Sequence, residues 1–172
     1  MATTDQTSIF SPVQLGPLTL RNRIIKAATF EGMAIDNMVT DAVVDFHRAF
    51  GEGRVGMTTL AYCAVAPDGQ GAPNEIVVRE EAVPGLRYFV EAMHNLDVAA
   101  SIQLGHAGPV GLGIGGRALS SSKVFSKTRF KNTNPATESE IFRVIDDFEN
   151  AAVLSAKSGF DCIELHFGHG YL

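Results

Sequence analysis

The chain has 172 residues, 45% of them apolar, and a formal net charge of −5 at pH 7. This length permits a substantial core, and 19 Asp and Glu against 14 Lys and Arg argue against a nucleic-acid partner. No apolar run approaches the ~20 residues that cross a bilayer, and the start of the chain lacks signal-peptide features, so no membrane partner is expected. Cys63 and Cys162 lie far apart in the sequence, which predicts free thiols and a cytoplasmic location.

The amino-terminal part predicts a hairpin and a first core strand. Residues 9–21 alternate apolar and polar side chains on either side of Gly16 and Pro17, as in a small hairpin. Residues 23–28 are expected to form the first core strand. The strand leads into the segment from Thr29 to Met33, where a cofactor has room to approach the backbone.

A helix and a second strand follow. Thr40 is a candidate N-cap, and apolar residues at helical spacing run as far as the glycines at 51 and 53 (Val43, Phe46, Phe50). A strand over 55–61 then runs into residues 62–65, and Pro67-Asp68-Gly69 provides a turn.

A second helix is expected to begin near Pro84, because four apolar residues form a stripe at helical spacing (Leu86, Phe89, Val90, Met93). The third strand, over 98–104, brings Gln103 and then His106 to its carboxyl end.

Residues 109–136 carry several glycines and few periodic apolar positions. A loop of this length in a compact domain is more often functional than not, so an active-site loop or lid is expected. Gly111 to Gly116 match the spacing G-x-G-x-x-G. Neither a preceding strand nor a following helix frames them, which argues against a dinucleotide fingerprint.

Thr137 and Glu140 have the spacing of a capping box, and the helix they open is expected to stop at Gly159. Its expected buried face consists of five apolar residues (Ile141, Val144, Ile145, Phe148, Ala152). A short buried strand over 160–165 follows. The resulting order of strands and helices favours right-handed crossovers and a parallel sheet.

The carboxyl ends of parallel strands meet at one edge, so the polar residues at those ends are expected to share one face. These residues are Thr29, Tyr62, Gln103, His106, His166 and His169. His47 and His94, each alone on a helix, are expected to be surface or hydrogen-bonded histidines.

The last strand ends in the pattern His166-x-x-His169-x-Tyr171, with glycines between these residues. Two imidazoles at this spacing are able to direct ring nitrogens at one oxygen or anion, and a phenol beside them is able to supply a proton. A metal pair and an ordinary polar loop are the alternatives. A zinc site is disfavoured, because no further ligand stands at suitable spacing and Glu164 is expected deeper in the sheet.

Three separated motifs resemble the Old Yellow Enzyme family of FMN-dependent NADH:flavin oxidoreductases and enoate reductases. They are Leu20-Arg-Asn-Arg-Ile-Ile25, Ile102-Gln-Leu-Gly-His-Ala-Gly108, and Gly159-Phe-Asp161 through His166 to Leu172. The likeness runs from about Ile9 to the last residue. It implies an α/β fold, the first half of a TIM (β/α)8 barrel of about four β/α units with a short N-terminal hairpin, in which residues 1–172 form a single partial domain.

The resemblance also implies a cofactor, FMN, and a hydride donor, NAD(P)H. By this likeness Gln103 hydrogen-bonds the flavin pyrimidine, and Ala28, Thr29 and Tyr62 lie beside the flavin. The pair His166 and His169 binds the carbonyl oxygen of a small enone-like substrate, and Tyr171 donates the proton. No metal is implied.

The chain departs from the family pattern at several positions. It has Ala28-Thr29-Phe30 where many relatives have Pro, Met or Leu, then Thr or Cys; Pro109 stands where relatives have a basic residue; and Tyr62 occupies a position that is usually small. The later strands, which carry the phosphate site, are absent from these 172 residues. The 172-residue chain by itself is therefore expected to hold FMN weakly, not to turn over as a monomer and to self-associate, with a homo-oligomer as one possible form. The alternative function is a non-catalytic half-barrel that self-associates or pairs with another chain.

Overall fold

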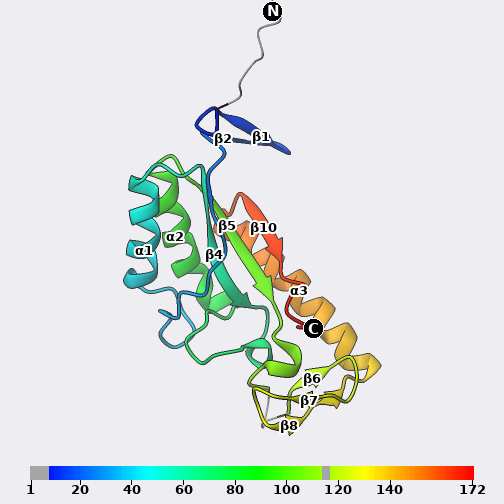
Figure 1. The fold of residues 1–172 in the computed structure, drawn as a ribbon. Helices are drawn as coiled ribbons and strands as arrows, with labels where there is room; N and C mark the ends of the chain where they lie inside the picture. The colour runs from blue at the N-terminus through cyan, green and yellow to red at the C-terminus, as the bar shows by residue number, and fades with distance from the viewer. Residues whose placement is uncertain (1–7, 114–116) are drawn as a thin grey trace, which may run out of the picture.

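The structure, a computed structural model, describes residues 8–113 and 117–172. Its centre is a four-stranded parallel sheet with the strand order β10-β5-β4-β3 (Figure 1). The strands are β3 (Ile25–Lys26), β4 (Met57–Ala64), β5 (Ala99–Gly105) and β10 (Cys162–Leu165). All three pairings between neighbours are parallel, so the predicted parallel sheet is confirmed.

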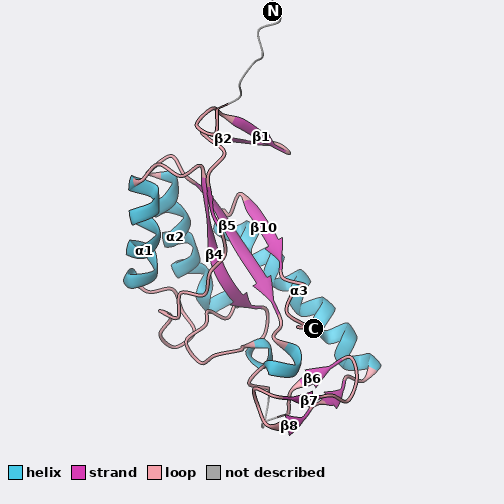
Figure 2. Cartoon of the chain, viewed as in Figure 1, coloured by secondary structure: helices cyan, strands magenta, loops and turns pink. Residues whose placement is uncertain are grey.

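Three helices connect the strands of this sheet: α1 (Asp41–Glu52), α2 (Val83–His94) and α3 (Glu138–Ser158). Helix α2 packs against both α1 and α3, so the helices form one layer beside the sheet (Figure 2). The predicted helix ends are also confirmed. Thr40 caps α1, Thr137 and Glu140 form a capping box on α3, and Gly159 ends α3 in the left-handed conformation with φ of 97°.

Two groups of short strands lie outside the central sheet. The predicted hairpin is present as β1 (Val13–Leu15) and β2 (Leu18–Leu20), paired antiparallel. The segment expected to be a long loop contains four strands of two residues, namely β6 (Leu119–Ser120), β7 (Phe125–Ser126), β8 (Lys131–Asn132) and β9 (Asn134–Pro135). The last three residues of the G-x-G-x-x-G match lie outside the described residues.

Single turns of 3-10 helix complete the chain, at Pro67–Gly69, Glu80–Ala82 and Gly108–Val110. The first of these is the predicted Pro-Asp-Gly turn.

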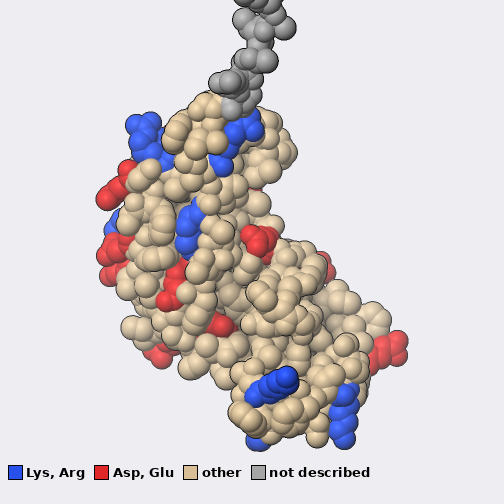
Figure 3. Space-filling view, viewed as in Figure 1, with Lys and Arg blue, Asp and Glu red and all other residues tan. Residues whose placement is uncertain are grey.

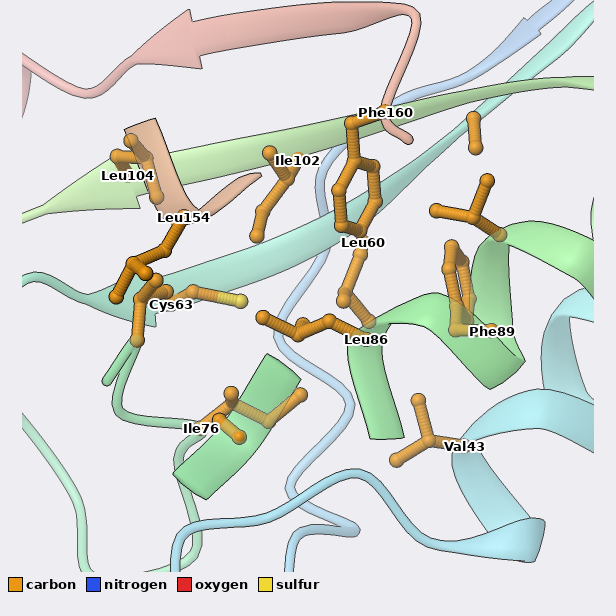
Figure 4. Packing of buried hydrophobic residues seen from close by; sticks show 14 of the residues in the cluster. Val43, Leu60, Cys63, Ile76, Leu86, Phe89, Ile102, Leu104, Leu154 and Phe160 are labelled. Atoms are coloured by element: carbon orange, nitrogen blue, oxygen red, sulfur yellow. The ribbon is translucent and has the colours of Figure 1, made fainter. Parts of the chain in front are cut away.

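The hydrophobic core lies between the sheet and the helices (Figure 4). The predicted stripe of α2 is buried as expected: Leu86, Phe89, Val90 and Met93 are each at most 2% exposed. They meet Leu60 of β4 and Ile102 and Leu104 of β5, whose side chains are fully buried. Burial of such side chains contributes on the order of 2 kcal/mol each, so this layer stabilises the packing of the helices on the sheet.

Two predictions of burial are wrong. On α3, Val144 is buried, but Ile141 and Ile145 are 48% and 54% exposed. In β10 the side chains of Glu164 and Leu165 are exposed. Ile141, Ile145 and Leu165 line an apolar hollow of about 470 Å3 between α3 and β10, and no described residue fills it. Glu164 does not line this hollow, and its carboxylate accepts a hydrogen bond from the Gln103 amide.

The first strand is also shorter than the predicted range, because only Ile25 and Lys26 pair with β4. Beyond Lys26 the chain leaves the sheet and is held by a buried carboxylate. Glu31 Oε1 accepts hydrogen bonds from Lys26 Nζ at 2.8 Å and from the Ala61 N–H at 3.3 Å. His47 bridges Glu31 at 3.0 Å and Thr58 Oγ1 at 2.7 Å, which satisfies both of its ring nitrogens. His47 is thus a buried, hydrogen-bonded histidine, one of the two expected outcomes.

We predict that Glu31→Ala lowers the free energy of unfolding by about 3 kcal/mol or more, because it leaves the Lys26 ammonium buried without its counter-charge. Reversible urea unfolding followed by circular dichroism measures the change. Glu52→Ala, at an exposed position in the last turn of α1, is the matched control and is expected to stay within about 0.5 kcal/mol of the wild type. Equal stabilities of the two variants would show that the cluster contributes nothing.

Candidate functional site

The carboxyl ends of β4, β5 and β10 border a cleft of about 480 Å3. The register of the sheet determines which residues reach it: β10 pairs with β5 so that Glu164 lies opposite Gln103, and His166 follows immediately after the strand. Six of the predicted site residues line this cleft: Ala28, Tyr62, Gln103, His166, His169 and Tyr171. Residues from four separate segments of the chain therefore meet at one place.

The two histidines contact each other directly. His169 Nδ1 lies 3.0 Å from His166 Nε2, so one ring donates and the other accepts. His169 has φ of 59° and the following Gly170 has φ of 69°, a left-handed turn that brings the second ring back towards the first. Partial burial and the neighbouring His169 lower the pKa of His166, so its ring is neutral at pH 7.

Tyr171 stands beside this pair. Its ring centroid is 5.0 Å from that of His166 and 5.6 Å from that of Tyr62, both in edge-to-face geometry. Burial, together with the negative charge of Glu75, raises the pKa of the Tyr171 phenol. The phenol is therefore protonated at neutral pH and is available as a proton donor.

Tyr62 presents only its ring to the cleft. The side chain is 7% exposed, and its hydroxyl donates to the Gly69 carbonyl oxygen at 2.8 Å. Burial raises the pKa of this phenol strongly. The hydroxyl thus hydrogen-bonds the turn at 67–69, and the aromatic ring lines the cleft.

Gln103 and Ala28 contribute a polar and a small apolar side chain to the lining of the cleft. The Gln103 amide donates to Glu164 Oε1 at 2.6 Å, which fixes its orientation, and the small side chain of Ala28 also lines the cleft. An oriented amide carries a donor and an acceptor side by side, the pattern needed to pair with a pyrimidine edge.

Two residues predicted for this face do not reach the cleft. Thr29 is exposed, and its hydroxyl donates to the Ala27 carbonyl oxygen at 3.4 Å. His106 is fully buried behind the turn at 67–69, where its Nε2 lies 3.7 Å from Asp68 Oδ2. Burial opposes the charge on Asp68, but His106 and Arg143 outweigh it and hold the pKa of the carboxyl well below its usual range. His106 therefore connects β5 to α3 through Asp68 and Arg143.

Glu75 was not among the residues predicted from the sequence, yet it lines the cleft although it is only 7% exposed. Burial raises the pKa of its carboxyl, and the backbone N–H groups of Gly71 and Ala72 oppose this effect. The residue lies in an irregular segment with no motif around it. Phe30, Gly71, Ala72, Val110 and Thr128 complete the lining.

Within the described ranges, no group of three or more His, Cys, Asp or Glu side chains is arranged to hold a metal ion. None of the described helices is long and apolar enough to span a bilayer.

Comparison with known proteins places these features in context. Residues 8–172 match the model of the NADH:flavin oxidoreductase / NADH oxidase family. Over its whole length the chain is 43% identical to a 4,4'-dithiodibutanoate disulfide reductase of Rhodococcus erythropolis, of which it covers 43%. It is 29% identical to an NADPH dehydrogenase of Halalkalibacterium halodurans, with 95% of this chain and 49% of that protein covered.

The fold is similar to that of an old yellow enzyme homologue from Zymomonas mobilis, with a TM-score of 0.86 and 24% identity. The match covers 96% of this chain and 50% of that structure. The chain thus spans about half the length of the proteins it matches, and the expected first half of a barrel with an amino-terminal hairpin is confirmed.

We predict that His166 titrates with a pKa below the usual 6.5 and that His169→Ala raises it, because the variant removes the neighbouring ring that disfavours the charged form. Nitrogen-15 NMR of the histidine rings between pH 5 and 8 (roughly the range in which histidine titrates) measures both values. His94→Ala, which removes an exposed ring paired with Asp161, is the control and should leave His166 unchanged. An unchanged His166 midpoint in the His169 variant would contradict the coupling.

Proposed function

The chain belongs to the NADH:flavin oxidoreductase family, whose members are FMN-dependent NAD(P)H oxidoreductases, and from this premise we propose that it reduces an activated C=C bond with hydride taken from NAD(P)H. The observation that carries this proposal is the convergence of His166, His169 and Tyr171 beside Gln103 in one cleft. A carbonyl-binding pair, a proton donor and an oriented amide are the groups that this reaction requires from the protein.

The histidine pair binds the carbonyl oxygen of the substrate in this proposal. The ring nitrogens His166 Nε2 and His169 Nδ1 hydrogen-bond each other in the absence of ligand, and a carbonyl oxygen entering between them takes the place of that bond. As hydride arrives at the β-carbon, negative charge grows on this oxygen, and N–H donors directed at it stabilise the charge.

Tyr171 then supplies the proton. Its hydroxyl gives a proton to the α-carbon as the β-carbon receives hydride, so one hydride and one proton convert the C=C bond into a saturated C–C bond. The raised pKa of the phenol keeps the proton on the oxygen until charge develops on the substrate. The aromatic rings of Tyr62 and Phe30 line the cleft in which this step takes place.

The residues of the cleft fit FMN as the hydride carrier. Bound FMN would accept hydride from NAD(P)H and pass it on from its ring. The oriented Gln103 amide suits the pyrimidine edge, Ala28 leaves space for the ring, and the ring of Tyr62 forms a side wall. Thr29 is proposed only as a neighbour of the flavin, since its side chain is turned away from the cleft.

The segment 109–136 is proposed as the active-site loop, because Val110 and Thr128 line the cleft. Its charged side chains are all basic in a chain of net charge −5, and Figure 3 shows basic groups at the end of the molecule formed by β6–β8. Lys127 flanks Thr128 and is exposed. A basic segment beside the cleft favours the approach of an anion such as NAD(P)H.

Two other candidate functions have specific support. The 43% identity to a disulfide reductase favours a disulfide as the acceptor in place of a C=C bond. The apolar hollow between α3 and β10 favours the alternative in which the 172-residue chain self-associates as a non-catalytic half-barrel. Free thiols at Cys63 and Cys162 fit a reducing compartment, and we propose the cytoplasm.

We predict that a full-length protein that contains this chain is yellow when purified with FMN, that its flavin absorption bleaches on addition of NAD(P)H, and that an enone or a disulfide restores the absorption. The 172-residue chain by itself is expected to hold FMN weakly. Stopped-flow spectroscopy distinguishes the two acceptors by their rates of reoxidation. Size-exclusion chromatography with light scattering is run on the same sample. Colourless oligomers would support the self-associating half-barrel, and a colourless protein with stoichiometric zinc would overturn the flavin proposal.

We predict that Tyr171→Phe slows reoxidation of the flavin by an enone about 100-fold, the scale of a lost general acid, while reduction by NAD(P)H keeps its rate. His166→Ala and His169→Ala should instead weaken binding of enone and phenolic ligands, by about 1–3 kcal/mol each. Stopped-flow traces of the two half-reactions and ligand titrations separate these effects. Equal slowing of both half-reactions in the Tyr171 variant would contradict its role as proton donor.

A further inference from the structure

Glu75 is a buried acidic side chain that lines the cleft. Its Oε2 accepts a hydrogen bond from the Gly71 N–H at 2.7 Å. The backbone N–H of Ala72 also acts on this carboxyl, and no side chain among the described residues donates to Oε1 of Glu75, which is 7% exposed and lines the cleft. Because Glu75 lines the cleft, a ligand in the cleft is able to donate a hydrogen bond to this oxygen.

The position of Glu75 is fixed by the segments around it. Asn37 Nδ2 donates to the Glu75 carbonyl oxygen at 2.9 Å and to the Pro73 carbonyl oxygen at 3.1 Å. The side-chain amide of Asn74 donates to the Gly32 carbonyl oxygen at 2.6 Å. The carboxyl is therefore held in place before any ligand arrives, which reduces the entropy lost on binding.

Gly71 leaves the space beside this carboxyl open. A Cβ on Gly71 would lie 3.3 Å from Glu75 Oε1 and 3.9 Å from Tyr171 Oη. The absent side chain thus creates a gap between the carboxyl and the phenol hydroxyl. Because the gap lies next to the Tyr171 hydroxyl, a substituent that occupies it is one carried by the substrate carbon beside Tyr171.

We propose that Glu75 and the gap at Gly71 form a subsite for acceptors that carry a cationic hydrogen-bond donor, such as an ammonium group, on the α-carbon that Tyr171 protonates. The proposal rests on the function proposed above, since the histidine pair and Tyr171 determine how the acceptor lies. The charged groups support it: among the described residues, those that line the cleft include Glu75 but no Lys or Arg. A carboxylate at the same position is repelled.

The test uses three enones that differ only in the α-substituent, which is ammoniomethyl, methyl or carboxylate. For the flavin-loaded wild type we expect kcat/KM to favour the ammonium compound over the methyl compound by about tenfold or more, with the carboxylate compound last. Glu75→Gln should bring kcat/KM for the ammonium compound down to that for the methyl compound. It should also raise kcat/KM for the carboxylate compound. The corresponding saturated ketones bind without reacting, and their Kd values from calorimetry should follow the same order.

Two further variants keep the test decisive. Gly71→Ala leaves the charge in place but fills the gap, so it should remove the ammonium preference even if Glu75→Gln fails to fold. Glu80→Gln changes an exposed carboxyl outside the cleft and should behave as the wild type. If the methyl enone is turned over but both cleft variants keep the wild-type preference for the ammonium compound, the subsite proposal is wrong and the proposed function stands. If no enone or saturated ketone binds, the subsite proposal and the proposed function are both wrong.

Discussion

The parallel pairing of β4, β5 and β10 is the constraint on which the site depends. Parallel neighbours run in the same direction, so their carboxyl ends, and the residues that follow them, gather at one edge of the sheet. The register then selects the side chains: Glu164 opposite Gln103 orients the amide, and His166 begins where the pairing ends. A shift of one residue would turn Gln103 away from the cleft, because alternate side chains of a strand point to opposite faces.

Segments without regular structure complete the lining of the cleft, and buried hydrogen bonds hold these segments in place. Glu31 holds the chain that leaves β3, and Asn37 and Asn74 join this chain to the segment that carries Glu75. These contacts supply donors and acceptors that a sheet would otherwise provide, so irregular backbone is buried without loss of hydrogen bonds. The result is a cleft whose polar groups are positioned by the fold before a ligand arrives.

The two sides of β10 differ in character. Towards the cleft the chain presents the histidine pair and Tyr171, whereas towards α3 it borders an apolar hollow lined by Ile141, Ile145 and other side chains. Apolar surface of this kind is stable when covered, by further chain or by another molecule. The chain matches about half of the length of these relatives, and this surface lies on the side of the sheet where β10 is the last strand. The polar side carries the proposed chemistry and the apolar side carries the proposed association.

Much of this protein was determined by local sequence. Periodic apolar residues predicted the three long helices, and the pattern from His166 to Tyr171 predicted a polar cluster. Thr40 predicted where α1 begins, and the capping box and Gly159 predicted where α3 begins and ends. Each of these signals lies within a few residues of the structure it specifies, because capping and helical periodicity are short-range interactions.

Tertiary structure alone decided the rest. Glu75 has no motif and enters the cleft only because Asn37, distant in sequence, holds its segment there. His106 follows its strand as predicted, yet it packs behind the turn at 67–69, where it meets Asp68, which is itself paired with Arg143. The exposure of Ile145 likewise depends on what covers α3. In all three cases the outcome depends on contacts between residues far apart in the chain, which local residue patterns do not encode.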